Sequence, residues 1–179
     1  MPQVTVRRTD RARSLTPITL LEFEALDRTH GEVVQALREL ERLLDRMDAD
    51  DLDADARAMA RVLCGFFDGT ARIHHEDEER VVFPPLLAGT DVELIQHVRR
   101  LQQDHSWLEE DWRELRPQLV AIAEGIDLHD AASLRQMACV FGALYVEHIA
   151  LEESLIYPAA RLCQAAAEIA QRRRVEAAI

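Results

Sequence analysis

The sequence predicts an all-α protein, an up-down-up-down antiparallel four-helix bundle with a short C-terminal helix and a flexible N-terminal arm. Helix-forming residues dominate the composition, whereas aromatic residues make up only 5% of the chain. Apolar residues recur at spacings of three and four over long stretches, and no alternating strand pattern competes with them. Turn segments and prolines divide these stretches into four helices of roughly 25–30 residues, which favours antiparallel neighbours.

The first helix is predicted from a capping pattern and a long apolar stripe. Residues 1–15 are polar and charged without any period, so we expect a flexible arm there. Thr16 and Pro17 are typical of an N-cap followed by the first helical position. The stripe that follows includes His30 and stops at the acidic segment 47–55, the first predicted turn.

Prolines and turn residues delimit the other helices. The second helix is predicted to stop at Pro84, and residues 88–91 form the second turn and cap the third helix. The fourth helix is predicted to run from about Ser133 to Tyr157 and to end at Pro158. The chain is therefore divided into an arm (1–15), a bundle (16–158) and a C-terminal helix (159–179).

Length, net charge and cysteine spacing exclude several classes of protein. A chain of 179 residues fits one domain, and its formal net charge of −12 argues against a general binder of nucleic acids or anionic membranes. The cysteines Cys64, Cys139 and Cys163 lie far apart and are expected to be reduced. Neither a signal peptide nor an apolar run of about 20 residues is visible, so we expect a soluble cytoplasmic protein.

An internal repeat carries the functional signal. The second and fourth helices both end in the pattern His-x-x-x-Glu-Glu-x-x-x-[Phe/Tyr]-Pro, which begins at His74 and again at His148. One upstream histidine in each half fits the same repeat: His30 lies 44 residues before His74, and His105 lies 43 residues before His148. The chain therefore consists of two similar helical hairpins, which we expect to pair with approximate two-fold symmetry.

The repeat predicts a metal centre at one level of the bundle. Residues i and i+4 share a helix face, and counting from the turns puts the four histidines within about 2–5 Å of one height. Four imidazoles and two carboxylates suit two six-coordinate iron ions, with positions left for an oxo or hydroxo bridge and for O₂ or NO. We expect His30 with His74 at one iron and His105 with His148 at the other, although spacing alone does not fix this division. The six predicted ligands are His30, His74, Glu78, His105, His148 and Glu152, the two glutamates acting as bridges.

The doubled motif, together with one histidine on each of the other helices, resembles the hemerythrin-like HHE domain over roughly residues 17–158. The resemblance implies a non-haem di-iron site and a role in O₂ or NO binding or sensing, iron handling, or oxidative and nitrosative stress. Oxygen-carrying hemerythrins have a second histidine four residues along the third helix, where this chain has Glu109. They also take their last carboxylate from an aspartate five residues after the histidine, whereas Glu152 follows His148 by four.

A set of four histidines and two glutamates more closely resembles the di-iron proteins that repair iron–sulfur clusters. Iron donation for such repair is therefore the alternative to binding of a diatomic ligand. A ferritin-like oxidase is a weaker alternative, because that class uses Glu-x-x-His pairs. A metal-free interaction module is a second weaker alternative.

The sequence leaves the roles of several residues open. Glu109 is either a seventh ligand or a surface carboxylate, and Tyr145 either hydrogen-bonds near the metals or packs in the core. Glu79 and Glu153 are expected to be solvated or to support the ligands from outside. Three histidines fall off the apolar stripe and are expected at the surface: His75, His97 and His129.

Overall fold

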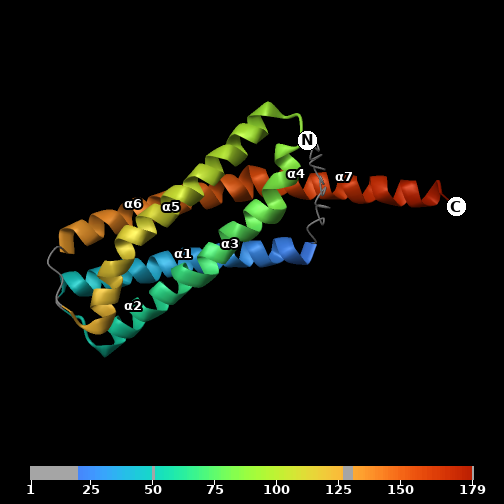
Figure 1. Cartoon of the computed structure of the whole chain (residues 1–179). Helices are drawn as coiled ribbons and strands as arrows, with labels where there is room; N and C mark the ends of the chain where they lie inside the picture. Colours follow the sequence, from blue (N-terminus) through green and yellow to red (C-terminus); the bar gives the residue numbers. More distant parts are fainter. Residues whose placement is uncertain (1–19, 50, 127–130, 179) are drawn as a thin grey trace, which may run out of the picture.

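A computed structural model describes residues 20–49, 51–126 and 131–178 (Figure 1). The expected N-terminal arm, the Thr16–Pro17 cap and His129 lie outside these residues. The described residues form helices joined by turns and contain no strand, which confirms the predicted all-α class.

The helices follow one another as four long segments. The first is α1 (Leu20–Asp48). The second consists of α2 (Ala54–Phe66), η1 (Phe67–Ala71), α3 (Arg72–Asp77), η2 (Glu78–Val82) and α4 (Phe83–Leu87), where η marks a π-helical turn. The third is α5 (Val92–Glu124), and the fourth consists of α6 (Ala131–Leu151), η3 (Glu152–Ile156) and α7 (Tyr157–Glu176).

Contacts between the helices close a ring. The helix α1 packs against α2 and α6, and α5 packs against the same two helices from the other side. Successive segments run in opposite directions, so the arrangement is an antiparallel four-helix bundle, and the end of α7 projects beyond it (Figure 1).

Local sequence explains where the helices begin and end. The carboxylate of Asp53 accepts hydrogen bonds from the Asp55 and Ala56 amides at the start of α2, and Asp91 caps α5 in the same way. At the other end of α5, Gly125 adopts the left-handed conformation (φ 74°) that favours glycine.

The two motif prolines do not end their helices, so the predicted boundaries at Pro84 and Pro158 were wrong. Each proline follows a π-helical turn, in which the Phe83 and Tyr157 amides reach back five residues to the carbonyls of Glu78 and Glu152. Each proline therefore lies in the first turn of the next α-helical segment, where its missing N–H is tolerated. As a result, α6, η3 and α7 form one continuous helix.

The core consists of two apolar clusters with a polar layer between them. One cluster fills the end of the bundle near the first and third turns, with residues such as Leu40, Leu63 and Leu115. The other fills the opposite end and includes Phe23, Phe83, Leu101, Ile156 and Tyr157. On each helical segment, a buried histidine separates residues of one cluster from residues of the other.

Candidate metal centre

The polar layer contains the two most deeply buried carboxylates among the described residues. Glu78 and Glu152 both have 0% of their surface exposed, and their carboxylates face imidazoles from all four helical segments. The structure brings together all six residues that the repeat singled out: His30, His74, Glu78, His105, His148 and Glu152.

Helix geometry explains how two residues of each motif reach this layer. The pairs His74–Glu78 and His148–Glu152 are separated by four residues, so each pair lies on one helix face. Each glutamate is also the first residue of a π-helical turn. Such turns occur often at functional sites, because the extra residue changes the direction of the following side chains.

One group of donor atoms, which we call site A, consists of His30, His74, Glu78 and Glu152. The Nε2 atom of His30 lies 3.1 Å from Glu152 Oε2 and 3.9 Å from Glu78 Oε1. The Nε2 atom of His74 lies 3.5 Å from the same Glu78 oxygen. Two ligands bound about 2.1 Å from one metal lie about 3 Å apart when adjacent, so these separations suit a shared ion.

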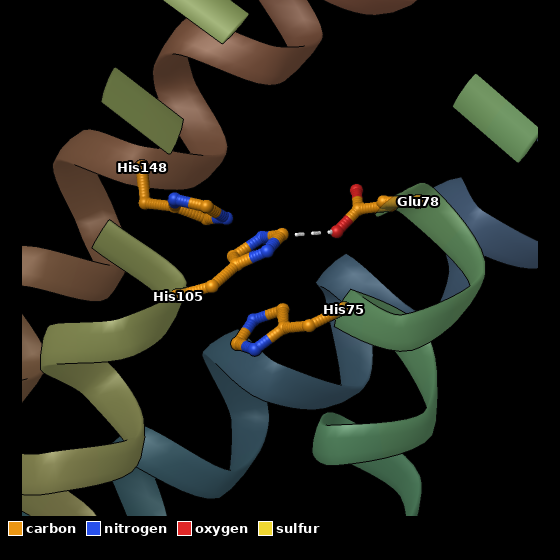
Figure 2. A group of neighbouring side chains, drawn as sticks. All are labelled: His75, Glu78, His105 and His148. Carbon is orange, nitrogen blue, oxygen red and sulfur yellow. Dashed lines mark ion pairs between the residues drawn. The ribbon is translucent and has the colours of Figure 1, made fainter. Parts of the chain in front are cut away.

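A second group, site B, consists of His75, Glu78, His105 and His148. The Nε2 atom of His105 lies 3.4 Å from Glu78 Oε2, and the Nε2 atom of His148 lies 3.2 Å from Glu152 Oε1. Figure 2 shows the three imidazoles and the carboxylate gathered from three helical segments, His75 and Glu78 sharing one of them.

Each glutamate faces both sites. Glu78 presents Oε1 to the site A histidines and Oε2 to His105, whereas Glu152 presents Oε2 to His30 and Oε1 to His148. This is the arrangement of two carboxylates that can bridge a pair of ions. Site A takes its histidines from the first hairpin, and His105 and His148 come from the second, as the two-fold repeat implies.

The second glutamate of each motif supports a histidine on another helix. Glu79 Oε1 lies 3.0 Å from Nδ1 of His105, and Glu153 Oε1 lies 3.1 Å from Nδ1 of His30. A carboxylate at Nδ1 orients an imidazole so that Nε2 points to a metal. Within each Glu-Glu pair, the first glutamate therefore faces the centre, and the second orients a histidine of another helix.

A tyrosine breaks the symmetry of the two halves. Phe83 stacks on His105 at 5.6 Å between ring centroids, and Tyr157, its counterpart in the repeat, stacks on His30 at 5.1 Å. The hydroxyl of Tyr157 donates a short hydrogen bond to Glu78 Oε1 and lies 3.2 Å from His30 Nε2. Burial and the nearby charge of Glu78 raise the pKa of Tyr157, so the hydroxyl keeps its proton.

The two carboxylates of the polar layer differ in pKa. Burial opposes ionisation of Glu78, but His74 and His105 outweigh it and hold the pKa of this carboxyl well below its usual range. Burial and the charge of Glu78 raise the pKa of Glu152 to about 8. Burial lowers the pKa of His74 to about 4, which leaves this imidazole neutral and able to bind a metal.

Comparison with known proteins now decides the family. The hemerythrin HHE cation-binding domain matches residues 21–160, which is most of the chain. The chain belongs to the hemerythrin HHE family. An uncharacterized protein of Haemophilus influenzae is 28% identical over 137 residues, which cover 74% of this chain and 75% of that protein. No solved structure matches the chain significantly.

Two open residues of this hemerythrin-like chain can now be placed. The Glu109 side chain is 69% exposed and lies 3.5 Å from Arg113, so the structure does not bring it to either site. Tyr145 is buried, and its ring packs against Phe67, Phe141 and His75.

The expectation that His75 lies at the surface was wrong. Its ring stacks on His105, and its Nε2 atom is buried. Burial and then His105 lower the pKa of His75 well below its ordinary value, so the ring is neutral. The repeat contained a signal for this position: the residue that matches His75 in the other half is Ile149, an apolar residue of the core.

Two pockets reach the centre from outside. The larger, about 760 Å³, is lined by His75, His105 and Tyr145 among others. The smaller, about 280 Å³, reaches His74 beside Thr29 and Thr70.

Among the described residues, no helix is long and apolar enough to cross a bilayer.

Proposed function

We propose that this hemerythrin-like protein holds two iron ions, one in site A and one in site B, and binds or senses a small diatomic ligand, O₂ or NO. The observation that carries the proposal is that Glu78 and Glu152 each present one oxygen to site A and the other oxygen to a histidine of site B. A mononuclear site needs no such pair of shared carboxylates. The proposed ligands are those predicted from the repeat: His30, His74, Glu78, His105, His148 and Glu152.

The buried polar atoms fit a bound metal. The Nε2 atoms of His75, His105 and His148 and Glu78 Oε2 have no hydrogen-bond partner among the described residues, although they lie in the core. Leaving such groups unpaired in the interior costs free energy, and metal ions would satisfy them together. Imidazole with carboxylate ligands suits iron, and hard carboxylates bridge two ions readily.

The protein supplies orientation, exclusion of water and a proton donor. Two iron ions would supply a redox-active centre with coordination positions for a diatomic ligand. Glu79 and Glu153 orient His105 and His30 toward the centre, and the apolar clusters on both sides restrict water. The Tyr157 hydroxyl holds a proton beside His30 and donates it in a hydrogen bond to Glu78, which keeps this carboxylate in place.

The depth of the centre favours ligand binding over iron supply. Glu78 and Glu152 are fully buried, so release of an ion to another protein requires the bundle to open. The pockets at His74 and at His75 are wide enough for a diatomic molecule and end at the two sites.

Anaerobic titration tests this function. Protein loaded with ferrous iron is mixed with NO and, separately, with O₂, while visible absorption and iron retention are followed. We expect saturable ligand-dependent absorption bands with the iron retained. Unchanged spectra with both gases would contradict diatomic binding, and rapid loss of iron to a weak chelator would favour iron donation instead.

A further inference from the structure

We propose that His75 is a third imidazole ligand of site B, so that the two metal sites have unequal ligand sets. This inference rests on the proposed metal binding and adds to it a residue that the two-fold repeat does not contain. Site A would then have two imidazoles, from His30 and His74, and site B would have three, from His75, His105 and His148.

The position of the His75 donor atom carries the inference. One of its ring nitrogens lies within 4.8 Å of donor atoms of Glu78, His105 and His148. Its Nε2 atom is buried and has no hydrogen-bond partner among the described residues. A histidine that only packs in a core normally hydrogen-bonds both polar atoms to protein or water, so this nitrogen needs a partner.

The surrounding rings pack His75 beside site B. Because a metal lies in the plane of each imidazole that binds it, the His75 ring would turn out of its stack with His105 for both rings to bind one ion. The His75 ring lies 4.1 Å from the ring of His105 at an interplanar angle of 14°, and 5.5 Å from the ring of His148. Tyr145 stacks on it at 5.7 Å. The rings of His105 and His148 are 4.8 Å apart, so the three imidazoles form a compact triangle beside Glu78 (Figure 2).

Helix position explains why only one half of the repeat provides this group. Ala71, His74, His75 and Glu78 follow the spacing i, i+3, i+4, i+7 that places residues on one face of a helix. The residue corresponding to His75 in the second hairpin is Ile149, which is only 7% exposed and belongs to the apolar core. Site A therefore receives no equivalent imidazole.

The inference also assigns the side from which a ligand is bound. His75 lines the larger pocket, and as a ligand it would occupy the position of site B that faces this pocket. Site A, reached through the smaller pocket at His74, would keep its position for an added ligand. The Tyr157 hydroxyl lies on this side, 3.2 Å from His30 Nε2.

Paramagnetic proton NMR of the full chain loaded with Co²⁺ or Fe²⁺ tests this assignment. Each metal-bound imidazole keeps one N–H proton, which gives a strongly shifted resonance that disappears in deuterated water. We expect five such resonances in the unaltered protein and four in His75→Phe, a variant that keeps a flat ring against His105 and Tyr145. His97→Phe is the matched control, because His97 belongs to neither site, and it should keep five.

In a second variant, added imidazole can take the place of the missing His75 ring. In His75→Ala, the larger pocket gives added imidazole a route to the vacated position, and imidazole should bring back the fifth resonance. Two bound metals with four resonances, unchanged in His75→Phe, would overturn the role of His75 and leave the proposed function standing. An unaltered chain that binds no metal would overturn both.

Discussion

The Tyr157 hydroxyl donates a hydrogen bond to the Glu78 carboxylate, so a residue of the second hairpin contacts the carboxylate of the first. The matching position in the first hairpin is Phe83, which has no hydroxyl to offer Glu152. The two carboxylates of the polar layer are thus supported unequally, although the motifs that contain them are nearly the same. This contact ties the two halves of the repeat together at the centre.

Tyr157→Phe should weaken this support without removing a metal ligand. The metal-free variant should lose about 1–3 kcal/mol in its free energy of unfolding, because a buried carboxylate oxygen loses its donor. Metal affinity should fall about 10–100-fold, the usual effect of removing a group that orients a ligand. Denaturant unfolding and competitive metal titration measure the two effects. Tyr145→Phe is the control, and an equal loss there would show that the Tyr157 contact is not special.

Neighbouring glutamates should behave differently when each is changed to glutamine. Glu152→Gln removes a carboxylate oxygen that faces His30 or His148, so we expect loss of at least one metal ion per chain. Glu153→Gln retains the bridge and weakens only the contact with His30 Nδ1, so it should keep two ions with affinity lowered about 10–100-fold. Metal analysis after dialysis against a weak chelator compares them. Full metal retention in Glu152→Gln would contradict the bridging role.

The stability of the metal-free protein should fall as pH rises from 6.5 to about 8. The folded-state pKa values of Glu152 and His30 are raised, so the folded chain holds protons that the unfolded chain has released in this range. The pKa values of His74 and His75 are lowered by burial, so the protons that these residues lose in the unfolded chain oppose the fall until about pH 7.5. The pKa of Glu78 is also lowered, and its effect lies below this range. Each proton involved contributes a slope of up to about 1.4 kcal/mol per pH unit.

Urea unfolding of chelated protein across this pH range measures that slope. Metal coordination displaces the same protons, so the slope should vanish in the loaded protein. Metal-free Glu152→Gln should show a shallower slope than the unaltered chain. A metal-free protein whose stability rises between pH 6.5 and 8 would contradict the assigned charges.

The sequence predicted the bundle and the polar layer because both follow from regular spacing. Apolar residues three and four apart define the helices, and the repeat places one histidine per helix at one level. His75 was missed because it follows His74 directly, and its inward direction depends on how the helix face is turned toward α5. The continuation of the fourth helical segment past Pro158 depends on a π-helical turn, which no residue pattern in this sequence predicts. The Tyr157–Glu78 contact joins residues 79 positions apart and required three-dimensional packing to be seen.

Metal removal should destabilise the fold around the polar layer. Ions that bind only the folded chain stabilise it by about 4 kcal/mol when free metal exceeds the dissociation constant by a thousandfold. We therefore expect a clear fall in the thermal midpoint after chelation, reversed by added Fe²⁺. Thermal unfolding followed by circular dichroism measures it, with His97→Phe as a control that should behave like the unaltered chain. An unchanged midpoint would mean that the centre holds no ion tightly.

The number of iron ions bound per chain tests the central claim most directly. Protein reconstituted anaerobically with Fe²⁺ and freed of loose metal is analysed for iron and for protein concentration. Two carboxylates that each face both sites predict two iron ions per chain. A value of one, or none, would contradict the dinuclear centre.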